Sequence, residues 1–121
     1  MRVEAWDLPV KAEWHRATAL GSLSFSQDGL QLYLIEEGSL RRWHLRFPEV
    51  QAFKLTTEES ASIVLDSLPA NGAFYEIVDS EWLQELGQGR LAYMSTAKHY
   101  VICCDDEVLE VVATGHSIEP A

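Results

Sequence analysis

Hydrophobic and polar residues alternate along much of the first half of the chain. In residues 22–26, Leu23 and Phe25 alternate with serines, and residues 30–36 continue in extended form after Asp28-Gly29. An Asp-Gly pair between two such runs predicts a β-hairpin. The expected turn is type I′, in which both central residues have positive φ.

The alternating pattern continues in residues 41–47, "RRWHLRF", and in residues 50–55, "VQAFKL". Gly38 and Pro48 mark the short turns that separate these segments. Four consecutive strands joined by short turns predict an antiparallel meander.

Residues 79–87 carry start and stop signals of a helix. Asp79 or Ser80 suits the N-cap, Glu81 suits the positive helix end, and Gly87 suits the stop. Such a short helix is not stable alone, so we expect its apolar face to dock on the sheet. The members of that face are Trp82, Leu83 and Leu86.

Residues 57–68 fit either a short helix or a loop. Thr56 with Glu59 fits a capping box, but the β-branched pair at 63–64 also suits a strand.

Residues 87–97, "GQGRLAYMSTA", come after the predicted helix at 79–87. We expect this stretch to be a mobile loop with Tyr93 and Met94 held by the core.

Residues 98–113, "KHYVICCDDEVLEVVA", predict a second hairpin that closes at Asp105-Asp106. Both strands are apolar on nearly both faces, which indicates central or helix-covered strands. The polar tail 116–121 is expected to fray.

The predicted fold is a single α+β domain over residues 1–121: a mainly antiparallel curved sheet or partial barrel with one short helix near residues 79–87. Trp6 and Trp14 are expected to anchor the first twenty residues. The predicted core comprises Phe25, Leu32, Leu34, Trp43, Leu45, Phe47, Phe53, Phe74, Ile77, Trp82, Leu86, Tyr100, Ile102, Leu109 and Val111.

Charge is divided unevenly along the chain. Residues 1–56 hold seven basic and seven acidic residues, whereas residues 57–121 hold two basic and twelve acidic ones, so the second half carries the whole net charge of −10. An acidic field of this size disfavours nucleic acid and anionic membranes and attracts a basic protein. It is also a common means of solubility. With no signal-peptide pattern and no apolar run near the roughly 20 residues of a membrane span, we expect a cytoplasmic protein.

The cysteines and histidines of the second hairpin do not form a recognisable reactive site. His99 and Cys103 share a strand face but lie roughly 13 Å apart along it, and Cys104 faces away. Neither cysteine has a basic neighbour that favours a thiolate. No G-x-S-x-G motif is present. We therefore expect no catalytic residues, no metal and no cofactor, and buried structural cysteines.

Two groups of charged residues are candidates for contact with a partner. The acidic group is Asp105, Asp106, Glu107 and Glu110. The basic group is Arg42, His44 and Arg46, on the polar face of one predicted strand. These three side chains either pair with acidic neighbours across the sheet or meet a partner or anionic ligand.

Three segments, "WHLRFPEVQAFKL", "FYEIVDSEWLQEL" and "KHYVICCDDEVLEVVA", resemble a group of small uncharacterised bacterial proteins, over about residues 43–113. Some proteins of this kind resemble immunity proteins, which bind and block a toxin. The matched positions are those of core residues, so the resemblance implies a fold more than an activity.

These observations give two functional hypotheses. The first is a non-catalytic protein-binding module with an acidic C-terminal half, in the manner of an immunity-type inhibitor of a basic protein. The second is a small ligand-binding or enzymatic barrel whose pocket uses Arg42, His44, Arg46 or His99. In either case an exposed edge strand is a natural place for homodimer formation.

Overall fold

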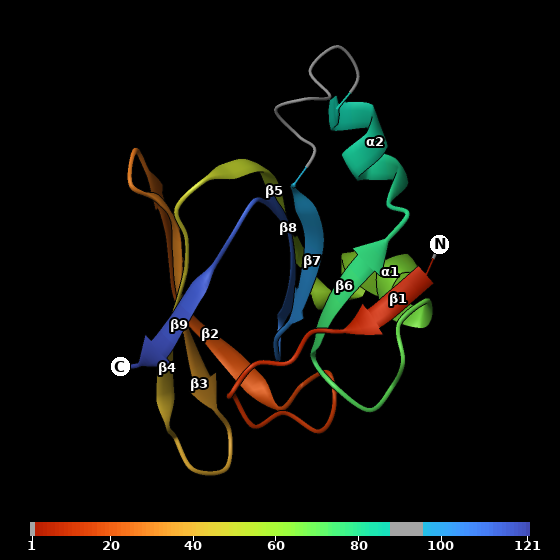
Figure 1. The fold of residues 1–121 in the computed structure, drawn as a ribbon. Coiled ribbons are helices and arrows are strands. Elements are labelled where there is room, and N and C mark those ends of the chain that lie inside the picture. The colour runs from red at the N-terminus through yellow and green to blue at the C-terminus, as the bar shows by residue number, and fades with distance from the viewer. Residues whose placement is uncertain (1, 88–95) are drawn as a thin grey trace.

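The chain forms two antiparallel β-sheets in a computed structural model that describes residues 2–87 and 96–121 (Figure 1). The five-stranded sheet has the order β1 (Arg2–Ala5), β6 (Phe74–Val78), β7 (Lys98–Cys103), β8 (Glu107–Ala113) and β5 (Val50–Thr57). The four-stranded sheet has the order β2 (Thr18–Ser26), β3 (Gly29–Glu36), β4 (Arg42–Phe47) and β9 (Ser117–Pro120).

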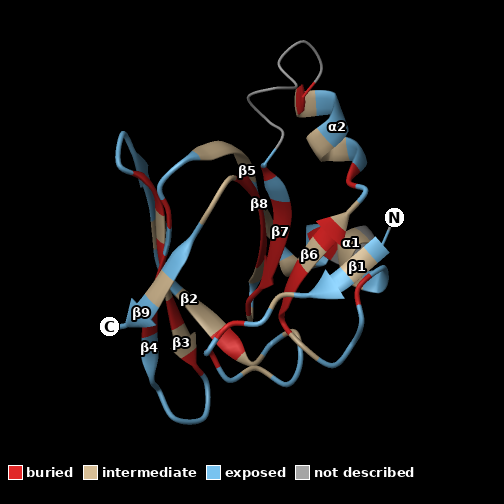
Figure 2. Cartoon of the chain, viewed as in Figure 1, coloured by how far each residue is buried: buried red, intermediate tan, exposed pale blue. Residues whose placement is uncertain are grey.

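The main core lies between the two sheets. Leu32 of β3 and Ile102 of β7 are fully buried, and the rings of Phe47 and Tyr100 meet across the sheets at 5.7 Å. Figure 2 shows the buried residues concentrated on β3, β7 and β8. Each such large side chain contributes about 1.5–3 kcal/mol through burial, so this interface is the main source of stability.

Both predicted hairpins are present, but the first turn differs from the prediction. Ser26 pairs with Gly29, and of the turn residues only Gly29 has positive φ, at 99°. A Cβ on Gly29 would lie 2.2 Å from the carbonyl oxygen of Phe47, so glycine is required there. The type I′ prediction was therefore wrong, because it also required positive φ at Asp28.

The predictions of a four-strand meander and of a partial barrel were wrong, as the strand order shows. β2, β3 and β4 form a meander, but β5 crosses to the other sheet and pairs with β8, and the sheets do not close into a barrel. β9 takes the place beside β4. The predicted frayed tail is thus an edge strand, where Pro120 is tolerated because it need not donate to the ladder.

The predicted helix at residues 79–87 is confirmed as α2 (Glu81–Gly87). Its apolar side chains pack on the face of the five-stranded sheet that carries Val112. The uncertain segment 57–68 is helical: a 3₁₀ turn, η1 (Glu58–Ala61), leads into α1 (Ser62–Asp66). The capping box was wrong, because β5 continues to Thr57 and Thr56 is still in the strand.

Most of the predicted core is buried, but Phe25 is not: 59% of it is exposed. Phe25 lies on the edge strand β2, where its ring contacts Phe53 at 5.2 Å and is otherwise exposed to solvent. Trp6 packs against Tyr100 at 4.3 Å as expected, whereas Trp14 is 55% exposed. The predictions for Tyr93 and Met94 lie outside the described residues.

Candidate functional site

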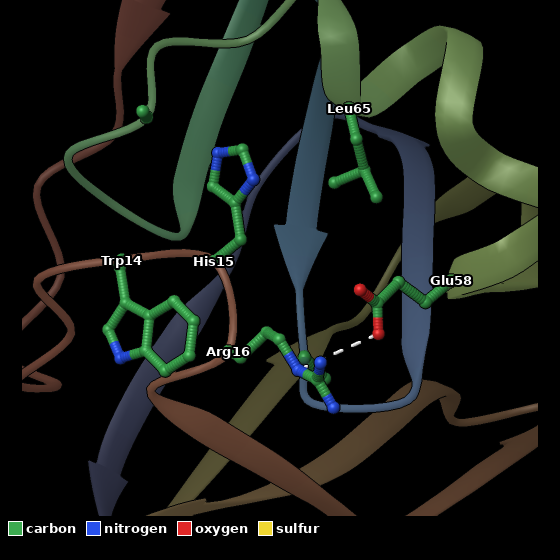
Figure 3. A pocket seen from close by; sticks show the side chains of 7 residues that line it. Trp14, His15, Arg16, Glu58 and Leu65 are labelled. Carbon is green, nitrogen blue, oxygen red and sulfur yellow. Dashed lines mark ion pairs between the residues drawn. The ribbon is translucent and has the colours of Figure 1, made fainter.

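An open hollow lies at the end of the molecule where the β7–β8 turn, α1 and the segment before β2 meet. One opening of about 240 Å³ is lined by Trp14, His15, Arg16, Glu58, Leu65, Ala70 and Cys104 (Figure 3). An adjoining opening of about 420 Å³ is lined by Arg16, Glu58, Glu59, Leu65, Asp66 and Asp106. We call these two openings together the acidic hollow.

Hydrogen bonds between backbone groups, and one from a side chain, hold together the elements that surround the acidic hollow. The amide of Glu58 donates to the carbonyl of Asp106 at 2.8 Å, and the amide of Asp105 donates to the carbonyl of Thr18 at 2.8 Å. His15 Nε2 donates to the carbonyl of Pro69 at 2.8 Å. Residues far apart in the sequence are therefore held together as one surface.

Arg16 is the only lysine or arginine among the described residues that line the acidic hollow. Its Nη2 lies 3.2 Å from Asp105 Oδ1, and its Nε lies 3.7 Å from Glu58 Oε2. These contacts, the hydrogen bond to Asp105 first, raise the pKa of Arg16. Since Glu59, Asp66 and Asp106 bring the carboxylates at this end to five, an excess of four negative charges remains.

The crowding of carboxylates also affects Glu107, the residue after the turn. Partial burial and repulsion by Asp106 and Asp105 raise its pKa, although a backbone hydrogen bond opposes the change. Burial is the largest cause of this rise, and the negative local field acts in the same direction.

The acidic hollow has apolar parts as well as charges. Trp14 stands at its edge with its ring exposed, and half-buried Leu65 faces it from α1 (Figure 3). Cys104 is buried, and burial is the main reason why its pKa rises to about 12. Cys103 is likewise buried with a pKa of about 12, so both cysteines are packing residues, as predicted.

A second polar constellation is buried beneath α2. Ser80 Oγ lies 2.7 Å from His99 Nδ1, and His99 Nε2 lies 2.9 Å from Glu110 Oε1. The exposed fractions of Ser80, His99 and Glu110 are 3%, 4% and 7%. Ser80 Oγ also accepts the amide proton of Leu83 at 3.1 Å, which confirms its predicted N-cap position.

Lys54 completes this buried network from β5. Its Nζ lies 3.8 Å from Glu110 Oε2 and 4.2 Å from the centre of the Trp82 ring. Burial alone raises the pKa of Glu110, but the hydrogen bond from His99 and the charge of Lys54 outweigh it, so the pKa is lowered. Glu110 is therefore an ionised, fully paired carboxylate at neutral pH.

The structure separates the residues that the sequence grouped as partner-binding candidates. Exposed Asp106 lines the acidic hollow and Asp105 binds its Arg16, whereas Glu107 lines neither opening. Glu110 is buried with His99 and is not part of that surface, because it lies three residues further along β8 and faces α2.

The basic group lies on β4, in the other sheet. His44 stacks on Tyr33 at 4.5 Å, bonds Gln31 Oε1 at 2.9 Å, and lies 3.9 Å from Glu119. Arg42 and Arg46 flank it with exposed side chains. Of the two alternatives for the basic group, His44 therefore follows the first, since it pairs with residues of the neighbouring strands β3 and β9.

Among residues 2–87 and 96–121, no group of three or more His, Cys, Asp or Glu side chains has an arrangement suited to a metal ion. No helix in this part of the chain is long and apolar enough to cross a membrane. Comparison with protein-family models, with curated proteins and with solved structures finds no match.

Proposed function

We propose that the protein is a binding module that takes up a basic segment of a partner protein at the acidic hollow. The main observation in its support is that four carboxylates line the acidic hollow, a fifth, from Asp105, binds its Arg16, and an exposed tryptophan stands at its edge. Tryptophan is among the residues that contribute most at protein interfaces, and surrounding charges steer a partner of opposite sign.

The arrangement of Arg16 supports this proposal. Its guanidinium already occupies a position between Asp105 and Glu58, and this contact supports the binding of a further basic side chain nearby. A partner's lysine or arginine would meet the remaining carboxylates of Glu59, Asp66 and Asp106. An apolar residue beside it would cover Trp14 and Leu65.

An immunity-type role in the cytoplasm, as an inhibitor of a basic toxin, is the biological form of this proposal that we favour. It is supported by the sequence resemblance over residues 43–113 and by the acidic second half of the chain. The inhibitor would act by covering the partner's basic surface, as expected of charge-complementary interfaces.

The test is the affinity of the chain for a panel of cationic peptides, each with two lysines or arginines flanking a leucine, in low and high salt. A triple variant, Glu59→Gln, Asp66→Asn and Asp106→Asn, should bind about tenfold more weakly, since exposed ion pairs are each worth about 0.5 kcal/mol. Added salt should weaken wild-type binding.

A matched triple variant serves as control: Glu4→Gln, Asp28→Asn and Glu49→Gln remove the same charge from exposed positions away from the acidic hollow. Equal loss of affinity in both triple variants would contradict a localised site. Wild-type binding that is insensitive to salt would contradict the electrostatic proposal altogether.

A further inference from the structure

A separate pocket of about 360 Å³ opens beside α2 and shares no lining residue with the acidic hollow. Its apolar lining comes from Val64, Ile77 and Trp82, and its polar lining includes the network of Ser80, His99 and Glu110. Pockets of this size and composition suit small molecules that are mostly apolar with one polar group.

The hydrogen-bond partners favour one arrangement of protons in this network when His99 is neutral. Ionised Glu110 only accepts hydrogen bonds, so His99 must carry its proton on Nε2. In neutral His99 the other nitrogen, Nδ1, is then an acceptor, and the hydroxyl of Ser80 donates to it. This is the relation between a nucleophile, its base and the group that orients the base.

Ser80 is also held in place on its other side. Its Oγ accepts the amide proton of Leu83, and the preceding Asp79 has φ of 61°, the left-handed conformation that non-glycine residues seldom adopt. A hydroxyl has one proton and two lone pairs. The Ser80 hydroxyl donates its proton in a hydrogen bond to His99, and one of its lone pairs accepts the amide proton of Leu83. The second lone pair of Oγ remains available.

We propose that Ser80 is an activated nucleophile that accepts the acyl group of a small ester bound in this pocket, with His99 as its base. The Oγ of Ser80 bonds to the carbonyl carbon while its proton passes to His99 Nδ1. The bond from carbon to the alcohol oxygen then breaks, and the alcohol leaves with that proton. Water, deprotonated by His99, releases the carboxylic acid and restores Ser80.

Each side chain has a distinct role in this step. Ser80 and His99 are the catalytic residues, because they touch the reacting atoms. Glu110 is a positioning residue that keeps the proton of His99 on Nε2. The acyl chain contacts Val64, Ile77 and Trp82, so a short aliphatic acyl group is the preferred substrate.

The test exposes the full chain to an alkyl fluorophosphonate and to p-nitrophenyl butyrate. We expect a single phosphonate adduct on Ser80, located by peptide mass spectrometry, and ester turnover. Ser80→Gly and His99→Gln should each lower the rate of adduct formation and the rate of ester turnover at least 100-fold. This factor is the low end of the rate enhancement that a positioned general base provides. Glycine is chosen because it is nearly as good an N-cap as serine.

Ser67 provides a matched control, because it lines the same pocket but donates its hydroxyl to the carbonyl of Val64 at 2.7 Å. Ser67→Ala should retain the adduct and the turnover. Thermal unfolding verifies that each variant is folded. No adduct on Ser80 in the folded wild type, or equal labelling of Ser67, would overturn the proposal.

The role of Glu110 has its own spectroscopic readout. The ¹⁵N chemical shifts of neutral His99 should identify the tautomer with the proton on Nε2. The opposite tautomer, protonated on Nδ1, would remove the acceptor for the Ser80 proton and would overturn the assigned base.

Discussion

Two constellations in this protein pair a carboxylate with a nitrogen donor, and they differ in burial. At the acidic hollow, Arg16 and Asp105 keep side-chain exposures of 46% and 37%. Beneath α2, His99 and Glu110 keep only 5% and 9%. Water screens the first pair, whereas the second must be fully hydrogen-bonded to be tolerated at all.

The difference in burial suits the two sites to different roles. The buried network has one geometry, with each of its polar groups satisfied, which suits positioning and proton transfer. The exposed carboxylates outnumber their cation and can exchange partners at little energetic cost, which suits attraction of a basic protein.

Removal of one partner from each pair should show the largest difference between the buried and the exposed site. His99→Leu should lower the free energy of unfolding by about 3–5 kcal/mol, because Glu110 stays buried without its main donor. Arg16→Leu should leave the free energy of unfolding nearly unchanged, because water screens the exposed ion pair. Urea unfolding of both variants measures the difference, and equal losses would refute it.

Removal of the exposed ring should separate binding from stability. Trp14→Ala should weaken binding of a cationic peptide by about 2 kcal/mol, near 30-fold, if the ring is an interface anchor. Its free energy of unfolding should change by less than about 0.5 kcal/mol. Leu40→Ala, at another exposed apolar residue (70%), is the control and should change neither.

Acid should weaken the buried pair selectively. The lowered pKa of Glu110 means that its contribution is fully present above the unfolded value, near 4.5, and is lost as pH falls through the folded value. Glu110→Gln should cost about 1.5 kcal/mol at pH 7, the low end for a hydrogen bond to a charged group. In urea titrations from pH 7 to pH 3, a difference between wild type and variant that stays constant would contradict this account.

Glu107 should respond in the opposite direction, with the smallest effect. Its raised pKa means that ionisation disfavours the folded state, and this penalty grows as pH rises through the folded value. Glu107→Gln should therefore stabilise the protein by a few tenths of a kcal/mol at pH 7. The same unfolding measurement applies, and destabilisation at pH 7 would contradict the predicted sign.

Local patterns predicted the individual elements well. The Asp105-Asp106 hairpin and the helix that begins after Ser80 follow from turn and capping chemistry, which depends on neighbouring residues only. The path of β5 and the pairing of β9 were missed, since the choice of sheet depends on contacts between residues far apart in the chain.

The buried network was missed although a signal was present. In the predicted hairpin, His99 and Glu110 lie diagonally on one face of two otherwise apolar strands, so each needs a polar partner. That Ser80 joins them depends on where α2 docks, which the sequence pattern does not specify. The carboxylates of the β7–β8 turn, in contrast, were named from the sequence as candidates for contact with a partner. Trp14 and Leu65, which lie beside them, were not.

The most direct test of the binding proposal is to map where a cationic peptide contacts the chain. During a titration followed by backbone amide NMR, we predict shifts confined to residues 14–17, 57–66 and 104–107, which diminish as salt is added. Shifts that cluster on β4, or no shifts at peptide concentrations that bind in the affinity assay, would contradict the proposed site.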